Sequence, residues 1–135
     1  MIVLSNSVEQ TLTPGQAVTF NLVKLKRGCG ECHRPGTSSV KLCNKGVYAV
    51  AFGGNIGGTV AGTPVQLTIE LGGDPLNETT MISTPGSVGD VNSVSRATYV
   101  ANCCCDFDRI TVVNTGTSDV VVGANSELTV AHCQR

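Results

Sequence analysis

The clearest pattern in the chain is a strict alternation of apolar and polar residues from Val65 to Leu71. Apolar side chains occupy the odd positions of this segment and polar side chains the even ones. Successive side chains of a strand point to opposite faces, so the alternation predicts a strand with one face buried and the other in water. Residues 62–64 and 72–75 bound the segment with the glycines and prolines that are typical of turns.

Similar short segments recur along the chain, separated by Gly, Pro, Asn and Ser, and no window keeps a helical period. Further strands are expected at residues 10–12, 17–23, 40–43, 47–52, 76–83, 95–101, 107–113, 120–122 and 128–133. Residues 24–39 predict a long loop. The glycine-dense residues 53–58 predict a flexible connector, because no helix pattern and no Gly-Lys-Ser/Thr ending supports a phosphate loop.

About eight to ten short, regularly spaced strands are typical of a sandwich or jelly roll. We therefore expect an all-β fold, a two-sheet antiparallel sandwich or jelly roll, with residues 1–135 forming a single domain.

The charge of the chain narrows its expected partners. The net charge is −1 and there is no long basic or acidic run, which argues against nucleic acid as a partner.

No apolar run approaches the length of a membrane span, and nothing after Met1 resembles a signal peptide. We therefore expect no membrane partner and no export by the general pathway.

Seven cysteines are the main candidates for chemistry, and an odd number excludes full pairing within one chain. Cys29 and Cys32 have the spacing with which two thiolates bind one zinc ion, and His33, Cys43 or a cysteine of residues 103–105 are candidates for the remaining ligands. The predicted metal site consists of Cys29, Cys32, His33 and Cys43, with structural zinc as its cofactor. We otherwise expect no cofactor.

Structural disulfides are the preferred alternative to zinc. Cys29, Cys32 or Cys43 would then link the long loop to the 103–105 region or to Cys133. The residues in that region are Cys103, Cys104 and Cys105. In an oligomer, the odd cysteine could also pair with a cysteine of a neighbouring subunit.

Four segments carry a resemblance to a known family. They are residues 46–52 (GVYAVAF), 65–73 (VQLTIELGG), 108–114 (DRITVVN) and 126–130 (SELTV). Together they resemble the jelly-roll modules of the tumour-necrosis-factor and complement type in their bacterial and phage form. Examples are the head domains of collagen-like spore-surface glycoproteins and small virion proteins of tailed phages. The resemblance covers roughly residues 8–133.

The resemblance implies a jelly roll that assembles as a compact homotrimer and serves adhesion, decoration or receptor binding. The chain departs from the family in two ways. It has no Gly-X-Y collagen stalk, and its cysteines are not part of the family pattern.

We therefore expect a structural phage virion protein, a capsid decoration or head-spike trimer that is assembled in the host cytoplasm and located in the virion. Its partners would be copies of itself, the major capsid protein or another virion protein, and a host-surface glycan. The alternative is a receptor- or carbohydrate-binding adhesion domain of a tail fibre, or of a spore or cell surface, with an extracellular location. We expect no enzyme, because the sequence has no G-x-S-x-G elbow and no other catalytic constellation.

Overall fold

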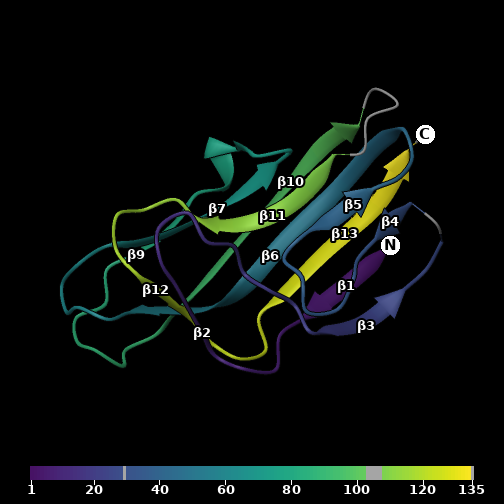
Figure 1. Ribbon diagram of the computed structural model, residues 1–135. Helices are drawn as coiled ribbons and strands as arrows, with labels where there is room; N and C mark the ends of the chain where they lie inside the picture. The colour runs from purple at the N-terminus through teal and green to yellow at the C-terminus, as the bar shows by residue number, and fades with distance from the viewer. Residues whose placement is uncertain (29, 103–107, 135) are drawn as a thin grey trace.

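The computed structural model describes residues 1–28, 30–102 and 108–134 (Figure 1). The described strands are β1 (Ile2–Ser5), β2 (Gln10–Leu12), β3 (Leu22–Lys26), β4 (Glu31–Cys32), β5 (Val40–Leu42), β6 (Gly46–Gly58), β7 (Val65–Leu71), β8 (Asp74–Pro75), β9 (Met81–Ser83), β10 (Asn92–Asn102), β11 (Arg109–Asn114), β12 (Val120–Val122) and β13 (Glu127–Gln134). One 3₁₀ turn, η1 (Asn77–Thr79), precedes β9. The described residues include no helix with the length and apolar character that a membrane crossing requires.

The strands form two antiparallel sheets, as the sequence predicted. One sheet has the order β2-β12-β6-β13-β1-β3, and the other has the order β4-β5-β11-β7-β8. In the first sheet, β10 pairs with one edge of β6 along most of its length. The opposite edge of β6 pairs first with β13 and then with β12. Figure 1 shows β6 crossing the molecule, with β13 and the N-terminal strand β1 side by side next to it.

The core lies between the sheets, and β7 supplies part of it as predicted. Val65, Leu67 and Ile69 are buried, and removing each from water contributes about 1.5–3 kcal/mol. The prediction that the other face of β7 is in water is wrong at Thr68, which is only 1% exposed. Its hydroxyl lies 2.8 Å from that of Thr115 and 3.2 Å from that of Thr80, so neighbouring turns cover this face.

Glycine-rich residues 53–58 are part of strand β6, and the prediction of a flexible connector is wrong there. Two of the glycines allow other segments to approach the strand closely. A Cβ atom on Gly54 would lie 2.8 Å from the Cβ atom of Ser126, and one on Gly57 would lie 2.6 Å from the backbone oxygen of Asp90. Glycine is needed here because other segments approach the backbone of the strand closely. A high glycine content alone does not distinguish such a strand from a flexible loop.

The N-terminal third departs from the prediction in a second place. Residues 17–23 do not form one strand, because the chain passes there from one sheet to the other. Ala17 bridges to Val113 in the second sheet, while Leu22 begins β3 at the edge of the first sheet and is 45% exposed. The predicted loop at residues 24–39 also contains the end of β3 and all of β4.

We predict that Gly54→Ala lowers the free energy of unfolding by about 1–3 kcal/mol, because the added methyl group must displace the buried Ser126. Ser126 has little freedom to move, since its hydroxyl donates to the Gly123 carbonyl at 3.0 Å. Urea denaturation of the purified protein measures the change.

Gly53→Ala is the matched control, because a Cβ atom at Gly53 would make an ordinary 3.7 Å contact with Ser95. It should leave stability unchanged within about 1 kcal/mol. Equal stability of the two variants would contradict the packing argument.

Candidate functional site

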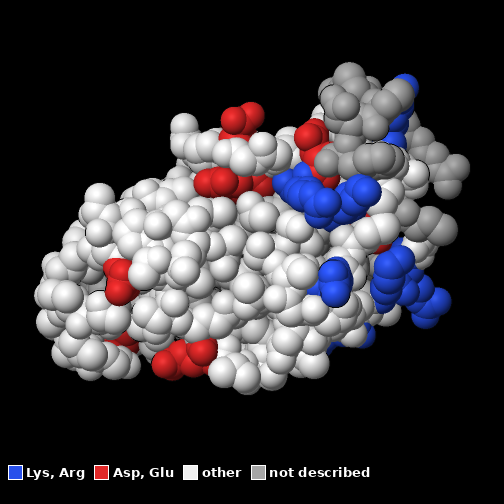
Figure 2. Space-filling model, viewed as in Figure 1, with Lys and Arg blue, Asp and Glu red and all other residues white. Residues whose placement is uncertain are grey.

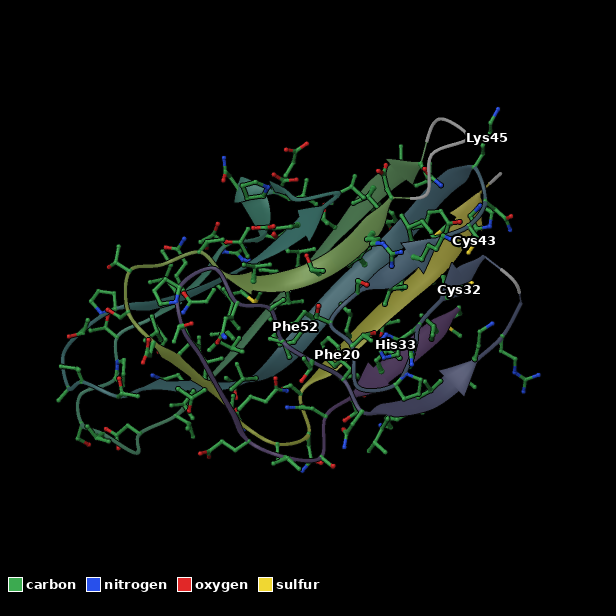
Figure 3. All side chains as sticks on the ribbon, viewed as in Figure 1. Phe20, Cys32, His33, Cys43, Lys45 and Phe52 are labelled. Carbon is green, nitrogen blue, oxygen red and sulfur yellow. The ribbon has the colours of Figure 1, made fainter. Side chains whose placement is uncertain are left out.

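Two of the predicted site cysteines meet at the β4–β5 pair. Cys32 lies opposite Lys41, and the Cys43 amide donates to the Gly30 carbonyl at 2.8 Å, which extends the ladder by one step. Alternate residues share a face of a strand, so Cys32 and Cys43 point to the same side. Their sulfur atoms lie 2.9 Å apart, and both thiols are free (Figure 3).

The two thiols differ in environment. Cys32 is exposed, whereas Cys43 is half-buried. Burial above all, and then the adjacent Cys32, raise the pKa of the Cys43 thiol to about 11, while the Lys41 ammonium partly opposes the shift. Cys43 is therefore protonated at neutral pH.

His33 is held by two backbone carbonyls. Its Nδ1 lies 2.9 Å from the Ser39 oxygen and its Nε2 lies 3.0 Å from the Phe20 oxygen. Both ring nitrogens therefore contact backbone oxygens and not the thiols of Cys32 and Cys43. The ring packs edge-on against the Phe20 ring, with 6.5 Å between the two ring centroids.

The predicted zinc site is brought together only in part. Cys32 and Cys43 are adjacent, His33 is engaged elsewhere, and Cys29 lies outside the described residues. Among the residues that the structure describes, no group of three or more His, Cys, Asp and Glu side chains is placed to hold a metal ion. Zinc binding by these residues stays a prediction.

Of the predicted disulfide partners of the loop cysteines, the structure describes Cys133. Cys103, Cys104 and Cys105 are outside the described residues. Cys133 is a free, exposed thiol on β13, and its sulfur lies 3.4 Å from the Ala131 carbonyl oxygen. Bridges from the loop to these cysteines also stay a prediction.

Sequence reasoning missed two residues that position this region. The Tyr48 hydroxyl donates to the Asn44 carbonyl at 2.8 Å, and its ring stacks on His132 at 4.5 Å. Burial raises the pKa of Tyr48 above its usual value, so its hydroxyl remains a donor. The buried Glu31 carboxylate pairs with the Met1 amino group and so joins β4 to the start of β1. Tyr48 belongs to the 46–52 segment that carries the resemblance, but nothing in the sequence indicates that it or Glu31 contacts this region.

A groove with several cationic side chains lies beside the thiol pair. Its volume is about 410 Å³, and Arg34, Thr37, Ser39, Lys41 and Arg109 are among the residues that line it. Arg109 lies directly across the β11–β5 ladder from Lys41, so the two cationic residues are neighbours on this face. Figure 2 shows Lys and Arg side chains gathered on the half of this face that carries β5 and β11.

A patch of uncharged residues lies on the outer side of the first sheet, bordered at one end by the exposed Lys24–Glu127 ion pair. Strand register aligns one row of residues across five strands: Ala97, Ala51, Thr129, Val3 and Leu25. A second row consists of Tyr99, Ala49 and Ala131. We call these eight residues the outer face.

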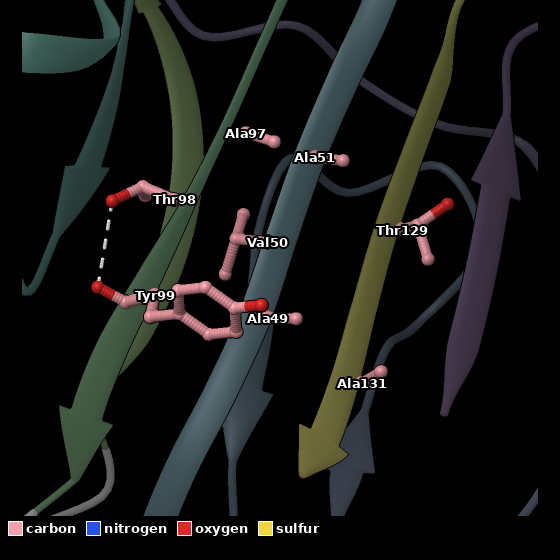
Figure 4. Close-up of a pocket in the computed structure, with 8 residues that line it drawn as sticks. All are labelled: Ala49, Val50, Ala51, Ala97, Thr98, Tyr99, Thr129 and Ala131. Carbon is pink, nitrogen blue, oxygen red and sulfur yellow. Dashed lines mark hydrogen bonds between the residues drawn. The ribbon is translucent and has the colours of Figure 1, made fainter.

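Tyr99 gives the outer face a large aromatic surface that is 73% exposed. Beside it lies a shallow hollow of about 360 Å³, with Ala49, Ala51, Ala97 and Ala131 among its lining residues (Figure 4). A contiguous exposed surface without charge is typical of a protein-interaction site.

No protein-family model and no curated protein matches the chain. Solved structures do match. The globular domain of zebrafish complement 1qA protein superimposes with a TM-score of 0.73 at 12% identity, covering 99% of this chain and 97% of that one. Eiger TNF from S. frugiperda gives a TM-score of 0.77 at 12% identity, with 98% and 90% covered.

The PRD1 vertex protein P5 also matches, with a TM-score of 0.55 at 14% identity, covering 97% of this chain and 93% of that one. Identities this low show the fold alone. The jelly-roll fold of the tumour-necrosis-factor and complement type, which the sequence resemblance implied, is therefore confirmed.

We predict that iodoacetamide labels Cys43 far more slowly than an ordinary cysteine at pH 8, because only the thiolate reacts. A pKa of about 11 in place of 9.0 lowers the thiolate fraction roughly 100-fold. The labelling rate should rise steeply between pH 9 and 11, as followed by peptide mass spectrometry. Half-maximal labelling of Cys43 near pH 9 would contradict the shift.

Proposed function

We propose that the chain is a homotrimeric structural protein of a phage virion, which decorates the capsid or forms the head of a spike. The observation that carries the proposal is the outer face. Its eight residues are uncharged and lie in register on five neighbouring strands, β10, β6, β13, β1 and β3.

A second copy of the chain is the occupant that fits this surface. Small side chains such as Ala49 and Ala51 allow another sheet or loop to approach closely, and Tyr99 supplies a large apolar anchor. Each Å² of apolar surface removed from water contributes about 25 cal/mol. Three copies related by a three-fold axis close the assembly without leaving an unpaired interface.

The fold supports the location in a virion. The chain shares it with the PRD1 vertex protein P5 over 97% of its length. In this proposal the trimer acts by geometry, with no reaction to catalyse. The buried outer face fixes the three subunits, and the loops at the rim contact the major capsid protein or another virion protein.

The cationic groove favours a second candidate, an adhesion domain for an acidic glycan on a host surface. Arg34 and Arg109 present guanidinium groups, which pair well with carboxylate and sulfate. The Ser39 hydroxyl, which accepts from Arg109 at 3.2 Å, has a proton that it can donate to a sugar oxygen. Such a domain would act outside the cell, and the two candidates are compatible in one trimer.

Ala51→Arg tests the homotrimer. The residue is exposed in the single chain, so the substitution should leave the fold intact while placing a charge in the proposed interface. We expect the trimer to dissociate to monomers, as measured by size-exclusion chromatography with light scattering and with circular dichroism as the test of folding. Burying an unpaired charge costs several kcal/mol, which is enough to prevent assembly at micromolar concentration.

The matched control is Ala61→Arg, the same substitution at an exposed alanine in the turn between β6 and β7. This variant should remain trimeric. A folded Ala51→Arg variant that is still trimeric would place the interface elsewhere.

Arg34→Ala tests the second candidate. We expect it to weaken binding of a sulfated heparin oligosaccharide about tenfold, because a charge-assisted hydrogen bond contributes roughly 1.5–3 kcal/mol. Surface plasmon resonance at two salt concentrations measures the affinity. Arg96→Ala, at an exposed arginine on β10 outside the groove, is the control and should change the affinity little. Equal effects of both substitutions would indicate attraction by overall charge and contradict a site in the groove.

A further inference from the structure

We propose that Cys32 and Cys43 form a cross-strand disulfide when the protein passes from a reducing cytoplasm to an oxidising medium. This pairing differs from the bridges to residues 103–105 or to Cys133 that the sequence predicted. It does not depend on the proposed trimer or on glycan binding.

The geometry carries the proposal. The two sulfur atoms lie 2.9 Å apart on one face of the β4–β5 pair, and a disulfide needs about 2.05 Å. The sulfur atoms therefore have less than 1 Å to move, and the β4–β5 ladder already brings the two residues close together. Cys32 is exposed and therefore accessible to a small oxidant.

The reaction is a thiol–disulfide exchange with a small disulfide such as oxidised glutathione. The Cys32 thiolate attacks one sulfur of the oxidant, a mixed disulfide forms on Cys32, and one glutathione thiolate leaves. Cys43 then loses its proton to solvent and attacks the Cys32 sulfur, which expels the second glutathione. The protein loses two hydrogen atoms and is oxidised, while one glutathione disulfide is reduced to two thiols.

Capping of Cys32 favours the second step. The hydrogen bond between the two cysteine side chains and the negative charge of the Cys32 thiolate both oppose ionisation of Cys43. Both disappear once Cys32 is in the mixed disulfide. The nearby Lys41 ammonium continues to favour the Cys43 thiolate. The exposed cysteine therefore acts as the entry point and the half-buried one completes the bond.

The bond would fix the segment that lines the cationic groove. His33, Arg34, Thr37, Ser39 and Lys41 all lie between the two cysteines in sequence and in the wall of the groove. Closing this short loop covalently restricts the unfolded chain and the opening of the β4–β5 pair. We therefore expect oxidation to raise the thermal midpoint by several degrees.

Disulfide mapping of the full chain tests the proposal. The protein is incubated with oxidised glutathione, free thiols are blocked with iodoacetamide, and the chain is digested. Trypsin and a glutamate-specific protease together cut this region into residues 28–31, 32–41 and 42–45, which separates its three cysteines. We expect a linked pair of peptides, 32–41 with 42–45, that is lost on reduction. Free, alkylated Cys43, or either cysteine bound mainly to another partner, would overturn the proposal.

Two variants sharpen the test. In Cys43→Ser the second step is impossible, so glutathione should remain attached to Cys32, and the gain in thermal midpoint on oxidation should be lost. Cys133→Ser removes an exposed thiol on β13 and should leave the link between the two peptides unchanged. If Cys133→Ser abolished the link, the pairing would be wrong. Mapping of the unmodified chain decides the matter if a variant fails to fold.

Discussion

The rest of the structure depends on the backbone pairing of β6 with three other strands. Along residues 46–58, one edge of this strand pairs with β10, and the other pairs first with β13 and then with β12. This pairing brings segments far apart in the chain into one sheet. It aligns the outer face, and it requires the glycines at 54 and 57 because Ser126 and Asp90 occupy the space of a side chain.

Sequence reasoning succeeded where local pattern and structure agree. The ends of β2, β7 and β12 were predicted correctly, because alternating or continuous apolar residues are bounded by turn residues. It failed at residues 53–58, since glycine serves both turns and close strand contacts. It also missed the outer face, because the sequence does not reveal which residues lie next to an outward-facing alanine such as Ala51. Only the strand register places Ala51 beside Ala97 and Thr129.

The candidate site shows the same limit. The predicted zinc site included both Cys32 and Cys43, and the structure places them side by side, while Cys29 lies outside the described residues. That contact depends on β4, a two-residue strand within a predicted loop. The cationic groove likewise depends on β11 pairing with β5, which brings Arg109 to Lys41 from a distant part of the chain. The proposed assembly through the outer face and the proposed recognition through the groove thus use different strands of one fold.

The central claim is that the outer face is buried between copies of the chain. Sedimentation equilibrium of the unmodified protein over a range of concentrations, with reductant present, tests it most directly. A homotrimer has a mass three times the 13.9 kDa of the chain, and we expect this mass. A mass of 13.9 kDa at every concentration would contradict it.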